Sequence, residues 1–358
     1  MATPTGATHS LTATVQAAQV PSALSDWFCL LCVCDMGLSI NTAGQSFVAG
    51  LEADLSDLEV CLADGETPTP WRRAEPALFS QTVGAEKLWL RVKVPAILSS
   101  ADTVVMAYRG CTAPVGENSG AGVLGAGDVL YLPGHSSGTS VPDLGGALNA
   151  TRNSAVTDAA GHVGTGQYSA TLIHGLSVPA AEALSPGVNL TVSMWLKHPV
   201  LNFQPYEYFF NHKSIWNGAG FSAYTEGSRR FFWRGGSGTT AVWNLSPALD
   251  DGAWHHVVFT AAGTSGILYT DGVSRGTKTI IAASAITQAL DVGNERGGYG
   301  MLGTIDGFRF VGRALGPNEV LADYRMTSAP ASWCVVEAED SMAGVGYRPW
   351  LLSGGRLR

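Results

Sequence analysis

Six cysteines are the residues with the most obvious chemistry, and three of them crowd into the segment CLLCVC at residues 29–34. Thiols at such spacing can form a zinc site or a redox pair. In a strand, however, Cys32 and Cys34 would point to one face and Cys29 to the other, so the three thiols would not converge on one ion. The others are Cys61, Cys111 and Cys334. We therefore predict free, buried cysteines that pack as small apolar side chains.

Histidines, glycines and acidic residues give weaker indications of a metal, phosphate or catalytic site. His255 and His256 are adjacent, so strand alternation would turn one ring inward and the other outward, which favours buried, hydrogen-bonded histidine over a metal site. The glycine-rich stretches at 235–238 and 297–300 open no helix and are expected to be hairpin turns, not phosphate cradles. The acidic run at 52–57 is typical of a solvated loop. The sequence contains no serine nucleophile elbow.

Aromatic residues beside amides are more suggestive, because sugar rings stack their apolar faces on Trp and Tyr while polar side chains bind the hydroxyl groups. The candidate glycan-binding residues are Trp216, Asn217, Tyr224, Trp233, Trp243, Asn244 and Tyr299. The alternative for the tryptophans is the core, since the chain has 10 of them to bury and sandwiches bury aromatic residues readily.

The composition indicates which elements must position these residues. The chain has 358 residues, enough for two packed cores, with 14% charged residues, 46% hydrophobic residues and 44 glycines. Few charges and many turn formers are typical of β-sandwiches. A net charge of -8 with 21 Lys plus Arg disfavours nucleic acid and anionic membrane surfaces as partners. The sequence has no run of eighteen apolar residues, so we expect no membrane insertion.

The strand pattern divides the chain into two β-rich units. Residues 10–113 contain candidate strands at 11–20, 27–34, 58–62, 88–94 and 103–108. A glycine-rich linker is predicted at 114–127. A second unit at 128–327 shows strand candidates about every ten residues and a short helix at 316–324. The fold class is therefore predicted as all-β, with two jelly-roll sandwich domains in tandem and a tail at 328–358.

Three segments of the second unit carry a resemblance to a known family. They are DGAWHHVVFT at 251–260 followed by GILYTDG at 266–272, LTVSMWLK at 190–197, and GTIDGFRF at 303–310. In this order they resemble the central hairpin, inner strand and closing strand of laminin-G-like, concanavalin-A-like jelly rolls. The resemblance implies that Trp195 and Trp254 are core residues.

The first unit is similar to a bacterial and phage domain of uncharacterised function that commonly precedes such modules. The matching residues are LEVCLADG at 58–65, LWLRVKVP at 88–95 and TVVMAYRG at 103–110. This resemblance implies a fold and little chemistry.

The jelly-roll resemblance implies glycan binding, adhesion or, in one branch, retaining glucanase activity. That branch needs two carboxylates about 5.5 Å apart, alternating along one strand. Glu207, Glu226 and Glu295 are isolated in the second unit, so we expect a protein that is not an enzyme.

Related sandwiches often tie their first and last strands together with one calcium ion. Asp306 in the motif Ile-Asp-Gly occupies the matching place, and Asp128 could supply a second oxygen. The resemblance thus implies one structural calcium and no other cofactor. The alternative is an aspartate that caps its own turn.

The function expected from these features is a non-catalytic structural and glycan-binding protein on a phage virion, as a decoration, spike or tail appendage. Residues 1–10 lack the features of a secretion signal, which favours synthesis in the host cytoplasm. The expected partners are other virion proteins, copies of the same chain and a surface glycan. The apolar tail is expected to pack on its own domains or on a neighbouring subunit. The alternatives are an exported bacterial polysaccharide-binding adhesin or accessory protein at the cell surface, and a glucanase-like enzyme with an atypical site.

Overall fold

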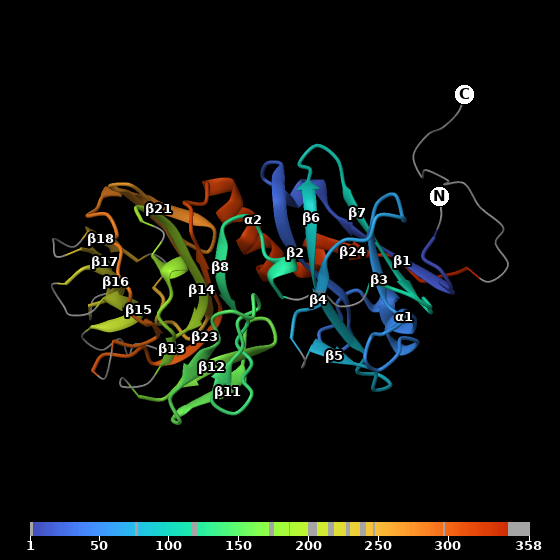
Figure 1. Cartoon of the computed structure of the whole chain (residues 1–358), viewed down its shortest axis with the longest axis horizontal. Helices are drawn as coiled ribbons and strands as arrows, with labels where there is room; N and C mark the ends of the chain where they lie inside the picture. Colours follow the sequence, from blue (N-terminus) through green and yellow to red (C-terminus); the bar gives the residue numbers. More distant parts are fainter. Residues whose placement is uncertain are drawn as a thin grey trace.

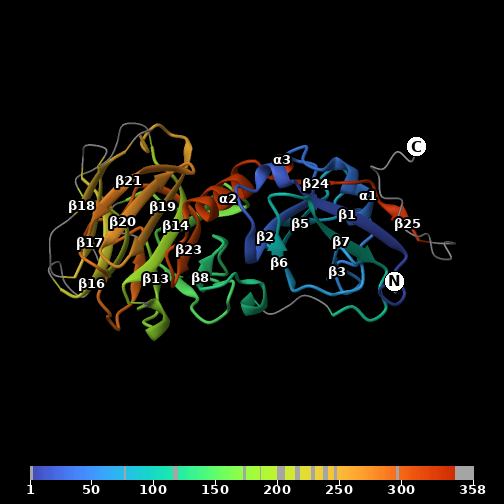
Figure 2. The same ribbon diagram turned by 90° about the horizontal axis from the view of Figure 1, so that it is seen from above.

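The computed structural model describes residues 3–75, 78–115, 120–171, 175–185, 187–199, 206–213, 218–226, 230–236, 241–245, 248–295 and 298–342. It is all-β, with about 47% strand and 11% helix. Two β units lie side by side along the long axis of the molecule, with helix α2 (Pro317–Ser328) between them (Figures 1 and 2). The predicted all-β class is confirmed.

The first unit contains two antiparallel sheets. One has the strand order β24-β1-β7-β3, with β25 also paired to β1; the other has the order β2-β6-β4, with β5 paired to β6. The bounds in the first sheet are β1 (His9–Val15), β3 (Glu59–Leu62), β7 (Thr103–Arg109), β24 (Cys334–Val336) and β25 (Asp340–Ser341). The bounds in the second sheet are β2 (Leu24–Asp35), β4 (Trp71–Arg73), β5 (Phe79–Ser80) and β6 (Lys87–Ile97). A short helix α1 (Gln45–Ala49) follows β2.

Strand β2 is apolar along most of its length because both of its faces are covered. Every residue from 27 to 35 is buried. On one side, α2 and the short helix α3 (Pro330–Trp333) pack against it. The Met326 sulfur accepts a hydrogen bond from the Leu30 amide at 3.1 Å, and the Trp333 indole donates to the Cys29 sulfur at 3.2 Å. All six cysteines of the chain are buried and free, as predicted.

The second unit is a sandwich of two sheets. The inner sheet, next to the first unit, has the order β11-β12-β23-β14-β19-β20-β21 with β8 paired to β23, and the outer sheet has the order β18-β17-β16-β15-β22-β13-β10-β9. The inner strands are β8 (Asp128–Leu132), β11 (Val156–Ala160), β12 (Thr165–Ser169), β14 (Asn189–Lys197), β19 (Trp254–Ala262), β20 (Ser265–Thr270), β21 (Val273–Thr279) and β23 (Gly303–Val311). The outer strands are β9 (Ser140–Val141), β10 (Ala150–Arg152), β13 (Leu176–Val178), β15 (Glu207–Lys213), β16 (Gly220–Thr225), β17 (Arg230–Gly235), β18 (Ala241–Asn244) and β22 (Leu290–Val292).

Aromatic side chains join the two sheets of this sandwich. Phe221 on β16 stacks on Phe310 of β23 with ring centroids 5.8 Å apart, and Trp233 on β17 stacks on Phe259 of β19 at 4.2 Å. These rings belong to one buried cluster that also takes aliphatic residues from both sheets. The large rings fill the space between the sheets, which is the main source of stability in a sandwich.

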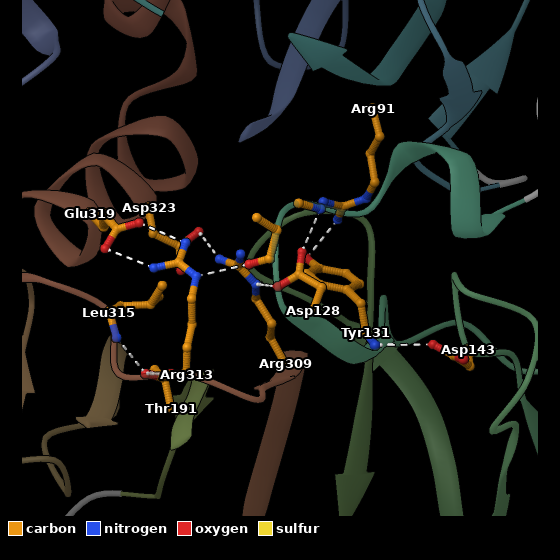
Figure 3. Close-up of polar contacts among 12 residues, drawn as sticks. Arg91, Asp128, Tyr131, Asp143, Thr191, Arg309, Arg313, Leu315, Glu319 and Asp323 are labelled. Carbon is orange, nitrogen blue, oxygen red and sulfur yellow. Dashed lines mark hydrogen bonds and ion pairs between the residues drawn. The ribbon is translucent and has the colours of Figure 1, made fainter. Parts of the chain in front are cut away.

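The predicted helix at 316–324 is present as α2 and continues to Ser328. Pro317 occupies the first turn, where its missing amide hydrogen is not needed. Glu319 accepts a hydrogen bond from the Gly316 amide at 2.8 Å and pairs with both terminal nitrogens of Arg313, at 2.7 and 3.0 Å. These contacts fix the start of the helix (Figure 3). None of the helices in the described ranges has the length and apolar character needed to cross a membrane.

The C-terminal segment differs from the predicted separate tail at 328–358. Strand β24 pairs with β1, with Val15 opposite Cys334 and Ala13 opposite Val336. Trp333 and Cys334 are completely buried. The first unit is therefore built from both ends of the chain, and the second unit is inserted between them. Residues 343–358 lie outside the described part.

The predicted linker at 114–127 is partly packed rather than free. Val123 and Leu124 are buried in the same cluster as the core of the first unit. The amide of Ala126 donates to the Asp26 carbonyl at 3.1 Å, and the Gly127 carbonyl accepts from Gly312 at 2.8 Å. The connection is thus bonded to both units.

A buried polar network lies between the two units (Figure 3). Arg309 on β23 donates through Nε to Asp128 at 2.7 Å, and its Nη1 lies 3.6 Å from a carboxylate oxygen of Asp323 on α2. Arg91 on β6 of the first unit donates to the Tyr131 hydroxyl at 2.6 Å, with its guanidinium 4.0 Å from the centre of the Tyr131 ring. Arg309 thus has carboxylate partners within the second unit, as a buried charge requires, and the bond between Arg91 and Tyr131 joins the two units.

Candidate functional site

The structure separates the predicted glycan-binding aromatic residues into two groups. Trp233 and Trp243 lie in the sandwich core with at most 1% of their surface exposed. Their indole nitrogens donate to the carbonyls of Ile281, at 3.1 Å, and Gly276, at 2.8 Å. These two tryptophans follow the core alternative and present no surface to a sugar. Trp216 and Asn217 lie outside the described residues.

Tyr224 belongs to a row of apolar side chains on the face of the outer sheet that points away from the core. In register across four neighbouring strands stand Tyr208, Tyr224, Phe232 and Val242. Tyr224 stacks on Tyr208 at 5.0 Å and on Phe232 at 5.1 Å between ring centroids. The three rings form a cluster of their own and are buried. These buried rings therefore offer little surface to a ligand. Any contact with a ligand must come from exposed residues at the end of the row.

At the β15 end of this row, four residues line a cavity of about 280 Å³: Tyr206, Tyr208, Glu295 and Tyr299. Tyr206 and Tyr299 are 37% and 46% exposed, and their rings meet edge to face with centroids 5.8 Å apart. The ring of Tyr206 is 6.2 Å from that of Tyr224. We call this cavity the tyrosine pocket.

Main-chain bonds hold the walls of the tyrosine pocket together. The amide of Tyr208 donates to the Tyr299 carbonyl at 3.2 Å, and the amide of Met301 donates to Gly293 at 2.9 Å. The segment that carries Tyr299 is thus bonded to the start of β15 and to the end of β22. Tyr206 has φ of 65°, a left-handed conformation that turns the chain into β15.

Glu295 is the acidic wall of the tyrosine pocket. Burial raises the pKa of its carboxyl group, and the negative charge of Asp291 on β22 raises it further. The charge of Glu295 in turn adds to the burial that raises the pKa of the Tyr208 hydroxyl. Asp291 itself accepts a hydrogen bond from the Ser177 hydroxyl at 3.1 Å. The pocket combines exposed rings with a hydrogen-bonding carboxyl group, the combination that sugar recognition requires.

Of the residues that line the tyrosine pocket, the predicted set contained Tyr299 and missed Tyr206, Tyr208 and Glu295. Asn244, also predicted, is exposed on β18 and does not line the pocket. The available signal was the spacing of Tyr206 and Tyr208, which alternate at the start of a strand. Glu295 carried no such signal because it lies in a turn.

The other acids of the second unit have structural partners. The Glu207 side chain is fully buried; its Oε2 lies 2.9 Å from His198 Nε2 and accepts from the Leu302 amide at 3.1 Å. Glu226 pairs with Arg230 at 3.2 Å on the surface.

The adjacent histidines have separate surroundings. His255 lies 2.8 Å from Asp271 and 3.1 Å from Asp251, and its hydrogen bond to Asp271 raises its pKa. His256 packs on Trp195 with ring centroids 5.0 Å apart. The predicted turning of one ring each way is consistent with these two environments.

The two aspartates predicted to hold calcium also have protein partners. Asp128 accepts from Arg309 at 2.7 Å and from the Gly125 amide at 2.8 Å. Asp306 accepts from the Val163 amide at 2.8 Å, and burial raises its pKa to about 7. Within the described ranges, no group of three or more His, Cys, Asp or Glu side chains is placed to hold a metal ion. The donor set there is incomplete, and the calcium site stays a prediction.

Residues 174–321 match the family model described as the concanavalin A-like lectin/glucanases superfamily. This segment is a concanavalin A-like jelly-roll domain. It contains both sheets of the sandwich from β13 to β23 and all four residues of the tyrosine pocket. The resemblance inferred from the three sequence segments is confirmed for this part of the chain. No curated protein matches the chain.

Solved structures with a similar fold cover part of the chain. The binding domain of Paraclostridial Mosquitocidal Protein 1 superposes with a TM-score of 0.46 at 18% identity, covering 56% of this chain and 52% of that chain. The botulinum neurotoxin serotype D binding domain gives 0.46 at 15% identity, covering 56% and 51%. Trypanosoma rangeli sialidase gives 0.45 at 14% identity, covering 66% and 42%. The chain thus spans about half the length of these proteins or less, and at these identities the likeness concerns the fold alone.

Proposed function

We propose that the jelly-roll domain binds a glycan in the tyrosine pocket and does not catalyse its hydrolysis. The observation that carries this proposal is the pair of exposed rings, Tyr206 and Tyr299, that stand edge to face beside the half-buried Glu295. A ring of this pair can stack on the apolar face of a sugar, while the carboxyl and hydroxyl groups bind its hydroxyls. The cavity volume of about 280 Å³ lies at the lower end of small-ligand pockets, which suits a terminal sugar or a short glycan segment.

Replacing Tyr299 by alanine tests the proposal. Truncating a central pocket aromatic typically costs more than about 1 kcal/mol of binding free energy, so affinity should fall about tenfold. The matched control is Tyr168→Ala, because Tyr168 is similarly exposed, at 38%, but lies on β12 of the inner sheet. Binding to an array of oligosaccharides is the measurement. Equal loss in both variants, or no loss in Tyr299→Ala, would contradict a site at this pocket.

We propose also that the first unit carries the jelly roll on the surface of a phage virion, with other virion proteins and copies of the chain as partners. Two features support it: the sequence resemblance of the first unit to a bacterial and phage domain, and the position of the outer sheet, which faces away from the first unit (Figure 1). The alternative is an exported bacterial adhesin or polysaccharide-binding accessory protein. Immunogold electron microscopy distinguishes the two, because label should lie on phage particles in the first case and on the cell surface in the second.

The second candidate function is hydrolysis, and one observation favours it. Glu295 has a raised pKa beside a second carboxylate, Asp291, as a general acid would. We expect no release of reducing sugar from polysaccharides, because neither acid belongs to the alternating pair on one strand that the glucanase branch requires. Release by the wild-type protein that is lost in Glu295→Gln would replace binding by hydrolysis as the function.

A further inference from the structure

We propose that a cavity at the junction of the two units binds a small oxyanion: a carboxylate, sulfate or phosphate group, either as a free ion or as the acidic group of a sugar. This site is separate from the tyrosine pocket, and the inference does not depend on the proposed glycan binding there. Three observations support it: the residues that line the cavity, a buried histidine nitrogen, and a pair of neighbouring arginines.

The junction cavity has a volume of about 140 Å³ and takes its walls from both units. The first unit contributes residues of β4 and the two residues after it, and the second unit contributes residues that follow β8 and β9. This volume is below the range of about 300–1,000 Å³ for pockets that hold drug-sized ligands, so it suits a small ion or one charged group of a larger ligand. The charged and polar residues that line the cavity are Arg72, Arg73, Glu75, His135 and Asp143.

Nitrogen-bearing side chains of both units offer donors to an oxyanion in the junction cavity. Arg72 and Arg73 come from β4, and guanidinium groups match the geometry of carboxylate and phosphate oxygens. Burial lowers the pKa of His135; the charge of Asp158 acts against this shift, and the charge of Arg72 adds to it. Arg72 of the first unit therefore lies close to His135 of the second.

His135 also carries the buried nitrogen. Its Nδ1 atom is buried and has no hydrogen-bond partner among the described residues. Buried polar atoms in proteins nearly always have a partner, which is often a bound ion or water where the chain supplies none. An oxyanion in the junction cavity would provide an acceptor for this nitrogen in its protonated tautomer.

Arg72 and Arg91 form the pair of neighbouring arginines. They stand directly opposite each other on the antiparallel strands β4 and β6, so their side chains leave the same face of the sheet. Like charges in this position destabilise a sheet. Arg91 is buried, and its Nε and Nη1 atoms have no hydrogen-bond partner in the described part of the chain. An anion beside Arg72 would offset the repulsion between the two guanidinium groups.

The two acidic residues of the cavity wall oppose an added anion only weakly. Burial raises the pKa of Glu75 to about 9, and the charge of Asp306 adds to the shift, so the Glu75 carboxyl group is mostly protonated at neutral pH. Asp143 is buried, and four amides at 3.0–3.2 Å donate to its two oxygens. The amide of Tyr131 is one of them (Figure 3). These amide dipoles partly compensate the one carboxylate charge in the wall.

Equilibrium dialysis of the full chain with radiolabelled sulfate tests the proposal, at neutral pH and with ionic strength held constant by sodium chloride. The wild-type protein should bind about one sulfate per chain, in a saturable manner. Arg72→Gln should weaken this binding at least about tenfold, because it removes a charged donor. His135→Ala changes the wall from the second unit and should also weaken it. The control Arg230→Gln removes an exposed arginine of β17 on the outer sheet and should leave the affinity unchanged.

Competition against the labelled sulfate distinguishes the two sources of the anion. Displacement by glucuronate but not by glucose would support an acidic sugar as the ligand, whereas displacement by inorganic phosphate alone would support a free ion. Tyr299→Ala should bind sulfate like the wild-type protein, because it changes only the tyrosine pocket. Three results would overturn the inference: no saturable sulfate binding by the wild-type protein, unchanged affinity in either cavity variant, or an equal loss of affinity in Arg230→Gln.

Discussion

Replacing Glu75 by glutamine should stabilise the protein at neutral and alkaline pH. Glu75 follows β4 in the first unit, is 3% exposed, and accepts a hydrogen bond from the Thr165 amide of the second unit at 3.0 Å. The Asp306 carboxylate accepts a hydrogen bond from the amide of Val163, which lies two residues before Thr165 in the same turn. Burial raises the pKa of the Glu75 carboxyl to about 9, and the charge of Asp306 adds to the shift. The contact between the units thus holds a carboxyl group that favours its protonated form.

The sign and size of the effect follow from proton linkage. The ordinary pKa of Glu75 is 4.5, so between pH 4.5 and about 9 the folded protein holds a proton that the unfolded chain has released. The stability that the protonated Glu75 gives the folded protein is fully present below pH 4.5. It is lost as the pH rises towards about 9, the pKa of Glu75 in the folded protein. One extra bound proton lowers the free energy of unfolding by about 1.4 kcal/mol per pH unit, or about 3 kcal/mol over two units. Glutamine cannot ionise, so the variant should escape this loss.

Urea denaturation at several pH values between about 5 and about 8 measures the effect. The difference in free energy of unfolding between Glu75→Gln and wild type should grow with pH in favour of the variant. Asp306→Asn should show the same trend over a lower range, because its pKa is raised from 3.8 to about 7. Glu182→Gln, at an exposed position, serves as the control and should run parallel to wild type. If the free energy of unfolding of Glu75→Gln ran parallel to that of wild type across this pH range, Glu75 would not be a protonated carboxyl group in the folded protein.

Other contacts give further tests. Trp333→Ala should lower the free energy of unfolding by about 3–5 kcal/mol in urea, since the side chain is completely buried. Deletion after Thr327 removes Trp333 and β24, so the truncated chain should show a broadened or absent unfolding transition. Asp128→Asn should lower the free energy of unfolding by about 1.5–3 kcal/mol in the same assay, because it removes the charged acceptor at 2.7 Å and leaves Arg309 with the more distant carboxylate of Asp323 at 3.6 Å; a loss below about 1 kcal/mol would contradict that pairing. If calcium binds through Asp306, EDTA should lower the melting temperature of wild type but not of Asp306→Ala, and identical curves with and without EDTA would rule the ion out.

The sequence alone determined the fold class and most strand positions. The apolar run around residues 27–34 and the alternating run at 88–94 predicted β2 and β6, because both patterns are typical of strands. The alternation did not show that Trp89 and Arg91, on the second face of β6, are also buried. The three motif segments of the second unit likewise predicted its jelly roll. Each segment lies within one strand or one hairpin, so neighbouring residues in the sequence carry the whole pattern.

Tertiary structure decided where the chain closes and which aromatic rings reach the surface. Strand β24 pairs with β1 across more than three hundred residues of chain, and its three residues carry no local sign of their partner. On β15, a bulge between Tyr208 and Phe210 breaks the alternation, so that Phe209 and Phe210 both enter the core while Tyr208 faces the pocket. An inserted residue shifts every following side chain by one face, and only the pairing with β16 shows where that shift occurs. The tyrosine pocket, including Glu295 from a distant turn, exists because of that register.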